Sequence, residues 1–146
     1  MTSDEAFEFI KKEKKTYDII FIDGLHFEAQ VDKDIQNSLD VLNKNGIIIV
    51  HDCIPPTEEH ASDPRTREIN WNGTVYKSII NVRFTRPDLF VCVIDTDWGC
   101  GLIKRMDNQP LYSKVLIEKA KEWNYFNKYK WELLNIISIN DFLYNP

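Results

Sequence analysis

The sequence predicts an α/β domain whose sheet begins with a parallel pair of strands and ends in an antiparallel strand. Two apolar runs, over residues 18–23 and 46–50, are typical of strands that are buried on both faces. An apolar stripe at steps of three and four residues lies between them and predicts a helix. Strand, helix and strand in this order form a βαβ unit with a right-handed crossover. The 146 residues suffice for one core, and we expect residues 1–146 to form a single domain.

A helix is expected before the first strand. Ser3 or Asp4 is expected to cap it, because a short polar side chain can accept a hydrogen bond from a free backbone N–H at a helix start. The helix continues to about Lys14. The strand that follows has the sequence DIIFID, an apolar run closed by Asp23 and then Gly24. Such runs are typical of parallel sheets, because helices cover both faces of these sheets.

The helix between the two strands is expected over residues 27–42 and is amphipathic. We expect Asn45-Gly46 to terminate it, because glycine favours the left-handed conformation that closes many helices. The second strand, GIIIV, ends at His51-Asp52. The apolar positions that predict the buried face of the helix are Phe27, Val31, Ile35, Leu39 and Leu42.

The second half of the chain begins with a long polar segment over residues 53–72 that contains three prolines. Loops of this length in compact domains often bind or cover a ligand. The last two strands are joined by a short link, which favours an antiparallel pair. The elements expected after the loop are a helix over residues 73–84, strands over 89–95 and 98–104, and a helix over 112–129.

The composition excludes several classes of protein. A net charge of −5 and a pI near 5.2 argue against a broad phosphate-binding surface, so we expect no nucleic-acid partner and no membrane partner. No apolar run approaches the roughly 20 residues that span a bilayer. The three cysteines have no CxxC spacing, which favours reduced thiols in a cytoplasmic protein.

Polar side chains follow both strands of the βαβ unit. Asp23 and His26 follow the first strand, and His51 and Asp52 follow the second. Neighbouring parallel strands end about 5 Å apart at one edge of a sheet, so we expect the four side chains to converge. Two carboxylates and two imidazoles can bind a divalent metal or transfer protons. The structural alternative is that Asp23 caps the next helix and His26 is a surface residue. His60, in the polar segment, is expected to be exposed.

Two segments resemble class I S-adenosylmethionine-dependent methyltransferases, namely YDIIFIDGLH at residues 17–26 and NGIIIVHDC at residues 45–53. WNGTVYK at 71–77 and DTDWG at 95–99 are similar to further segments of one subgroup, the small O-methyltransferases found near sugar and glycan biosynthesis. The resemblance spans residues 2–104. It implies methyl transfer from S-adenosylmethionine to a sugar or another small-molecule acceptor.

The resemblance covers the C-terminal half of that fold and implies a partial Rossmann-like sheet. The strands expected here correspond to strands 4, 5, 7 and 6 of the family's sheet, the last of them antiparallel. The family's first strand, its glycine-rich cofactor loop and the acidic residue that binds the ribose would precede Met1. This implies a truncated chain that binds S-adenosylmethionine weakly or not at all when alone.

Cofactor contacts are implied by the same resemblance. Ser3 and Asp4 resemble the segment that borders the adenine of the cofactor. Asp23 and Gly24 resemble the residues that face its methionine end. We therefore expect these four residues to line whatever cofactor site the chain retains.

Catalytic and metal-binding roles are implied as well. His26 resembles a general base of some sugar methyltransferases, with Asp23 beside it. In metal-dependent relatives the position of Asp23 binds magnesium together with residues after the next strand, which here are His51 and Asp52. Magnesium prefers oxygen ligands, so a site formed by Asp23, His51 and Asp52 favours manganese or iron, or no metal at all.

The resemblance also leaves the strand over residues 18–23 at an open edge of the sheet. An exposed apolar edge strand invites pairing with another strand. We therefore expect a homo-oligomer in which the same strand of a second copy covers this edge across a twofold axis. Two alternatives to an active methyltransferase stay open: a non-catalytic binding or oligomerisation module derived from one, and a metal-dependent hydrolase that uses the same polar cluster.

Overall fold

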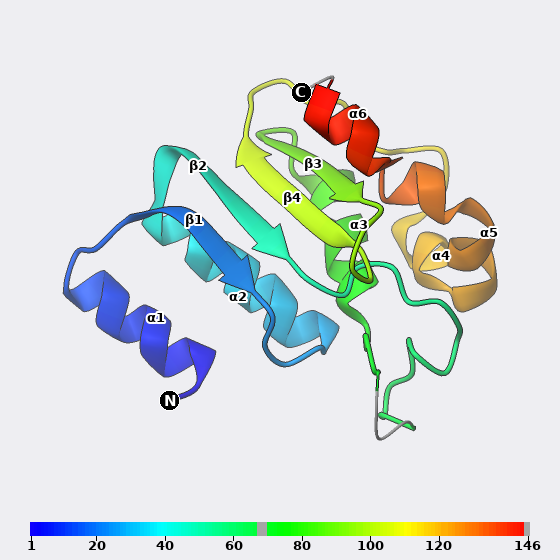
Figure 1. Cartoon of the computed structure of the whole chain (residues 1–146), viewed down its shortest axis with the longest axis horizontal. Coiled ribbons are helices and arrows are strands. Elements are labelled where there is room, and N and C mark those ends of the chain that lie inside the picture. Colours follow the sequence, from blue (N-terminus) through cyan, green and yellow to red (C-terminus); the bar gives the residue numbers. More distant parts are fainter. Residues whose placement is uncertain (67–69, 145–146) are drawn as a thin grey trace.

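The computed structural model describes residues 1–66 and 70–144, which contain a mixed sheet flanked by helices (Figure 1). Its five strands are β1 (Tyr17–Ile22), β2 (Leu42–Val50), β3 (Leu89–Ile94), β4 (Cys100–Arg105) and β5 (Ile136–Ile137). In the sheet they stand in the order β1-β2-β4-β3-β5. β1 is parallel to β2, β4 runs antiparallel between β2 and β3, and β5 is parallel to β3.

The predicted α/β class is confirmed. The antiparallel β4 lies between β2 and β3, which is the order that strands 4, 5, 7 and 6 have in the resemblance. The helices of the described residues are α1 (Ser3–Lys12), α2 (Glu28–Val41), α3 (Val75–Thr85), α4 (Ile117–Lys121), α5 (Trp123–Leu133) and α6 (Ile139–Tyr144). Within these residues, none of the helices has the length and apolar character needed to cross a membrane.

The core lies between the sheet and the helices α2 and α3, which lie behind it in Figure 1. The predicted apolar stripe of α2 is buried, with Val31, Ile35 and Leu39 at most 5% exposed. Ile48 and Val50 of β2 are also buried, at 0% and 1% exposed. The burial of these apolar side chains packs α2 against the sheet. Because β1 and β2 are parallel neighbours, their carboxyl ends lie at one edge of the sheet.

Two predicted helix boundaries are wrong. The cap of α1 is Thr2 rather than Ser3 or Asp4, because Thr2 and Glu5 hydrogen-bond each other's backbone N–H in a capping box. Asn45-Gly46 does not end α2, which stops at Val41; both residues belong to β2. A Cβ atom at Gly46 would lie 2.9 Å from the carbonyl oxygen of Asp18, so glycine here allows β1 to approach closely.

The helix predicted over residues 112–129 is wrong as a single element. It starts later and is divided into α4 and α5 at Glu122, whose backbone is extended (φ −64°, ψ 131°). After the break, the ring of Phe126 packs on the ring of Tyr76 on α3, with the ring centroids 4.0 Å apart. Tertiary packing therefore selects a break that the local sequence does not signal. β5 and α6 were also not predicted.

Candidate active site

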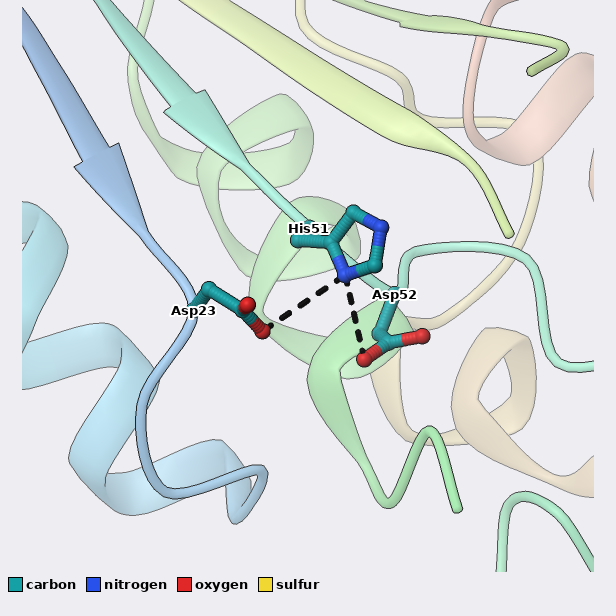
Figure 2. A group of neighbouring side chains, drawn as sticks. All are labelled: Asp23, His51 and Asp52. Carbon is teal, nitrogen blue, oxygen red and sulfur yellow. Dashed lines mark ion pairs between the residues drawn. The ribbon is translucent and has the colours of Figure 1, made fainter. Parts of the chain in front are cut away.

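The four polar side chains expected to converge do lie together, at the carboxyl ends of β1 and β2. Figure 2 shows three of them, Asp23, His51 and Asp52. Asp23 follows β1, while His51 and Asp52 follow β2 directly. His26 lies in the turn before α2. The parallel pairing of Ile22 with Val50 places these ends side by side, as the sheet edge requires.

Both imidazoles face the same two carboxylates. Nε2 of His26 lies 3.3 Å from Oδ1 of Asp23 and 3.4 Å from Oδ2 of Asp52. Nδ1 of His51 lies 3.5 Å and 3.3 Å from the same two oxygens. Asp23 is the most open of the four, with 44% of its side chain exposed, whereas the others are 13–18% exposed. The site is thus a half-buried pair of carboxylates between two imidazoles.

The orientation of His26 is fixed by a backbone contact. Its Nδ1 lies 2.9 Å from the carbonyl oxygen of Trp71, and a carbonyl can only accept, so Nδ1 carries the hydrogen. The second ring nitrogen, Nε2, is the one that faces the two carboxylates, and in a neutral ring it would be the nitrogen that can accept a proton. The Trp71 ring stacks on the imidazole, with centroids 5.8 Å apart. The Trp71 carbonyl and ring therefore fix the orientation of the His26 ring and cover most of it, so His26 is not a surface residue.

The structural alternative for Asp23 is also excluded. The N-cap of α2 is Phe27, with no side-chain cap of its own. The backbone N–H of Glu28 instead donates to the hydroxyl of Thr74, at 2.8 Å. Because Thr74 satisfies this helix start from another element, the carboxylate of Asp23 is available to the site.

The protonation of the cluster follows from burial and charge. Burial lowers the pKa of His51, but the carboxylates of Asp52, Asp97 and Asp23 outweigh burial and raise it above the usual value. Burial raises the pKa of Asp52, and the imidazoles of His26 and His51 offset this only in part. Both groups therefore hold protons more strongly than they would in water.

Asp52 adopts a backbone conformation that few residues tolerate, with φ at 64°. Its Oδ1 accepts a hydrogen bond of 2.7 Å from the side-chain amide of Asn72, which is 1% exposed. Oδ2 is left to face the two imidazoles. A strained residue with one oxygen held by a buried donor is an arrangement typical of functional sites.

Three groups of the site were not among the predicted site residues. They are the Trp71 carbonyl, the amide of Asn72 and the carboxylate of Asp97, whose Oδ2 lies 3.2 Å from Nε2 of His51. All three lie in the segments 71–77 and 95–99, which resemble methyltransferase segments. This resemblance was the sequence feature that could have identified them as site residues. The long segment 53–72 thus returns to the site at its end; its residues 67–69 lie outside the described residues.

The prediction that His60 is exposed is wrong. His60 is 8% exposed, and its ring stacks on Trp98 with centroids 5.9 Å apart. Its Nδ1 lies 2.8 Å from the hydroxyl of Thr57. The polar composition of the segment concealed this packing, because the aromatic partner of His60 comes from the β3–β4 turn.

Three of the four residues expected near the cofactor, Ser3, Asp23 and Gly24, line one small cavity. A cavity of about 210 Å³ beside the end of β1 is lined by Ser3, Phe7, Phe21, Ile22, Asp23, Gly24 and Asp34. Asp4, the fourth residue of the expected set, does not line it. Its carboxylate binds Lys33 at 2.5 Å and Gln30 at 3.1 Å, and the same Gln30 amide contacts the hydroxyl of Ser3.

Asp23, His51 and Asp52 have a geometry that fits a small cation. Each offers one ligand atom, and these atoms lie within 4.8 Å of one another. Nδ1 of His51 is buried and has no hydrogen-bond partner, although it faces both carboxylates. Two carboxylate oxygens and one imidazole nitrogen suit manganese or iron better than magnesium.

Comparison with known proteins points to methyltransferases. Residues 1–53 match a protein family described as a methyltransferase domain, and this range contains Asp23, His26, His51 and Asp52. Among solved structures, the chain is similar to the SAH-bound methyltransferase PaMTH1 of Podospora anserina, with a TM-score of 0.52 and 21% identity. The similarity covers 70% of this chain and 47% of that one. No curated protein sequence matches the chain.

This chain therefore spans about half the length of PaMTH1, and its sheet has the Rossmann-like fold of methyltransferases. In this methyltransferase-like fold the polar cluster lies at the carboxyl ends of β1 and β2. Ligands of open α/β sheets bind beyond these strand ends.

Proposed function

We propose that this protein acts in S-adenosylmethionine-dependent methyl transfer to a hydroxyl group of a sugar or another small molecule. The observation that carries the proposal is the convergence of Asp23, His26, His51 and Asp52 at the carboxyl ends of β1 and β2. The fold is that of methyltransferases, and all four residues lie in the segment that matches a methyltransferase domain.

The cofactor would lie at the end of β1. Ser3, Asp23 and Gly24 line the cavity there, and Asp4 is held beside Ser3 through Gln30. At about 210 Å³ this cavity is smaller than the roughly 300–1,000 Å³ typical of small-molecule sites. We therefore expect these residues alone to bind S-adenosylmethionine weakly or not at all.

His26 is the proposed general base. When bound, S-adenosylmethionine supplies an electrophilic methyl group. An acceptor hydroxyl placed between that group and Nε2 of His26 would give its proton to Nε2 as its oxygen bonds to the methyl carbon. The carbon–sulfur bond of the cofactor would break at the same time and release S-adenosylhomocysteine. The Trp71 carbonyl holds the ring in the required tautomer. The carboxylates of Asp23 and Asp52, at 3.3 Å and 3.4 Å, stabilise the imidazolium that forms.

Asp23, His51 and Asp52 are the proposed ligands of a divalent cation, with manganese or iron favoured by the imidazole. A bound cation would polarise and orient the acceptor oxygen. Asn72 and Asp97 are the proposed positioning residues, because they hold Asp52 and His51 by the atoms that do not face the site.

Binding is tested by titrating the ¹⁵N-labelled chain with S-adenosylhomocysteine and following backbone amide shifts by NMR. The expected result is a weak, saturable shift centred on Ser3, Asp23 and Gly24. A micromolar dissociation constant measured by calorimetry would refute the expectation of weak binding. Shifts that spare these three residues would contradict the proposed location of the cofactor.

Catalysis is tested by transfer of a labelled methyl group to a panel of sugars and small alcohols. Replacing His26 with alanine should lower transfer by roughly 10²–10⁴-fold. His60→Gln is the matched control, since His60 is a buried histidine outside the cluster, and it should retain transfer. Unchanged transfer in His26→Ala rejects the role of the base. Hydrolysis of phosphate or ester substrates by the manganese-loaded chain, without methyl transfer, would support the hydrolase alternative instead.

A further inference from the structure

We propose that β1 pairs with β1 of a second copy of this chain, antiparallel across a twofold axis, so that the two sheets become one. The surface involved is the free edge of β1, together with its exposed side chains Ile19 and Phe21. This inference concerns assembly; it shares Phe21 with the cavity proposed for the cofactor, and its test measures mass and cross-linking rather than methyl transfer.

The backbone of β1 has one free side. β1 is the first strand of the sheet and, within the residues that the structure describes, pairs only with β2. The carbonyl of Ile22 accepts from the N–H of His51, and the carbonyl of Asp18 faces Gly46, so both point toward β2. Successive residues of a strand alternate in direction. The N–H and C=O groups of Ile19 and Phe21 therefore point away from β2 and can pair with another strand.

The side chains at this edge are apolar and uncovered. Ile19 is 62% exposed and Phe21 is 58% exposed, whereas Ile22 is buried. The charged residue within the strand, Asp18, accepts a hydrogen bond of 2.7 Å from Asn43. Between β1 and α1 lies a cavity of about 250 Å³ with an apolar lining that includes Ile19 and Phe21. An exposed edge with this composition favours pairing with another chain.

The distribution of charge favours a second copy in the antiparallel direction. Lys14 and Lys15 precede β1, whereas Asp23 follows it and lies beside Asp52. An antiparallel pair places the basic end of each strand beside the acidic end of the other, which is favourable. A parallel pair of copies would instead place like charges together.

The register follows from the direction of the backbone groups. Because Ile19 and Phe21 carry the free groups, Ile19 lies opposite the partner's Phe21, and the reverse, as hydrogen-bonded pairs. Ile20 then faces its own copy across the axis as a non-hydrogen-bonded pair, with Cα atoms about 4.5 Å apart. This register overlaps the whole strand and is the one we propose.

The mass in solution tests the pairing. Light scattering of the purified chain should give twice the monomer mass of 17.2 kDa. Ile19→Lys and Phe21→Lys should each give the monomer, because they place charge at the paired edge. Leu143→Lys on α6 is the matched control, since Leu143 is also 58% exposed, and it should remain dimeric. Circular dichroism of each variant establishes that it is folded.

Cross-linking tests the register without weakening the edge. Ile20→Cys should form a disulfide-linked dimer on mild oxidation, because a Cα separation of about 4.5 Å suits a disulfide. Ile19→Cys should give no more disulfide-linked dimer than the unmodified chain gives. A monodisperse monomer at all concentrations would overturn the proposal. So would a dimer that survives both lysine substitutions, assembly into large particles without a dimer, or cross-linking at position 19 in place of position 20.

Discussion

Gly73 lies where the long segment 53–72 returns to the site, and its replacement by alanine should destabilise the fold strongly. Its backbone has a φ of +62°, in the left-handed region. Its N–H donates to the carbonyl of His60, and the next N–H, of Thr74, donates to the carbonyl of His26. A Cβ atom at Gly73 would lie 2.1 Å from the carbonyl oxygen of His26 and 2.8 Å from its Cβ atom.

The size of the effect has two parts. A left-handed conformation costs a residue with a side chain about 1–2 kcal/mol. A methyl group forced into a filled space costs about 1–3 kcal/mol more, because the neighbours must move. For Gly73→Ala the sum is a loss of about 2–5 kcal/mol in the free energy of unfolding, a large part of the roughly 5–15 kcal/mol available to a small domain.

Urea unfolding followed by fluorescence measures this loss. Gly24→Ala is the control, because a Cβ atom at Gly24 would meet no atom closer than Asp34 Oδ2 at 4.0 Å. It should change the free energy of unfolding by less than about 1 kcal/mol. If Gly73→Ala proved as stable as Gly24→Ala, the close approach of Gly73 to His26 would be incorrect. In the destabilised variant the NMR signals of the His26 ring should also move, since the methyl group displaces its backbone.

Two further predictions concern the carboxylate pair. Because the pKa of His51 is raised in the folded chain, its contribution to stability is fully present below the unfolded value near 6.5 and is lost as the pH rises through the folded value. As the pH rises above 6.5, the free energy of unfolding should therefore fall more in the natural chain than in His51→Gln, and parallel pH profiles would count against this. Asn72→Leu removes a buried donor from Asp52 and should cost about 1–3 kcal/mol in urea unfolding. Stability equal to that of the natural chain would show that water replaces the amide without loss.

The elements that could be predicted are those whose burial pattern is local. Apolar periodicity in the sequence predicts buried side chains, both in the run at residues 18–23 and in the stripe of Val31, Ile35 and Leu39. Strand ends in a parallel sheet share one edge, so the convergence of Asp23 with Asp52 also followed from local pattern. Gly46 misled the prediction because a glycine that permits close strand approach has the same sequence signal as one that ends a helix.

The sequence by itself determined the βαβ unit, the polar residues at its strand ends and the antiparallel pair that follows, because these depend on periodicity and chain direction. Tertiary structure alone decided that the Trp71 carbonyl sets the tautomer of His26, that Asn72 holds Asp52 and that Asp97 meets His51. These contacts join residues separated by 20 to 46 positions in the chain. No local pattern encodes such contacts, since they depend on how the loop packs over a sheet edge that other residues build.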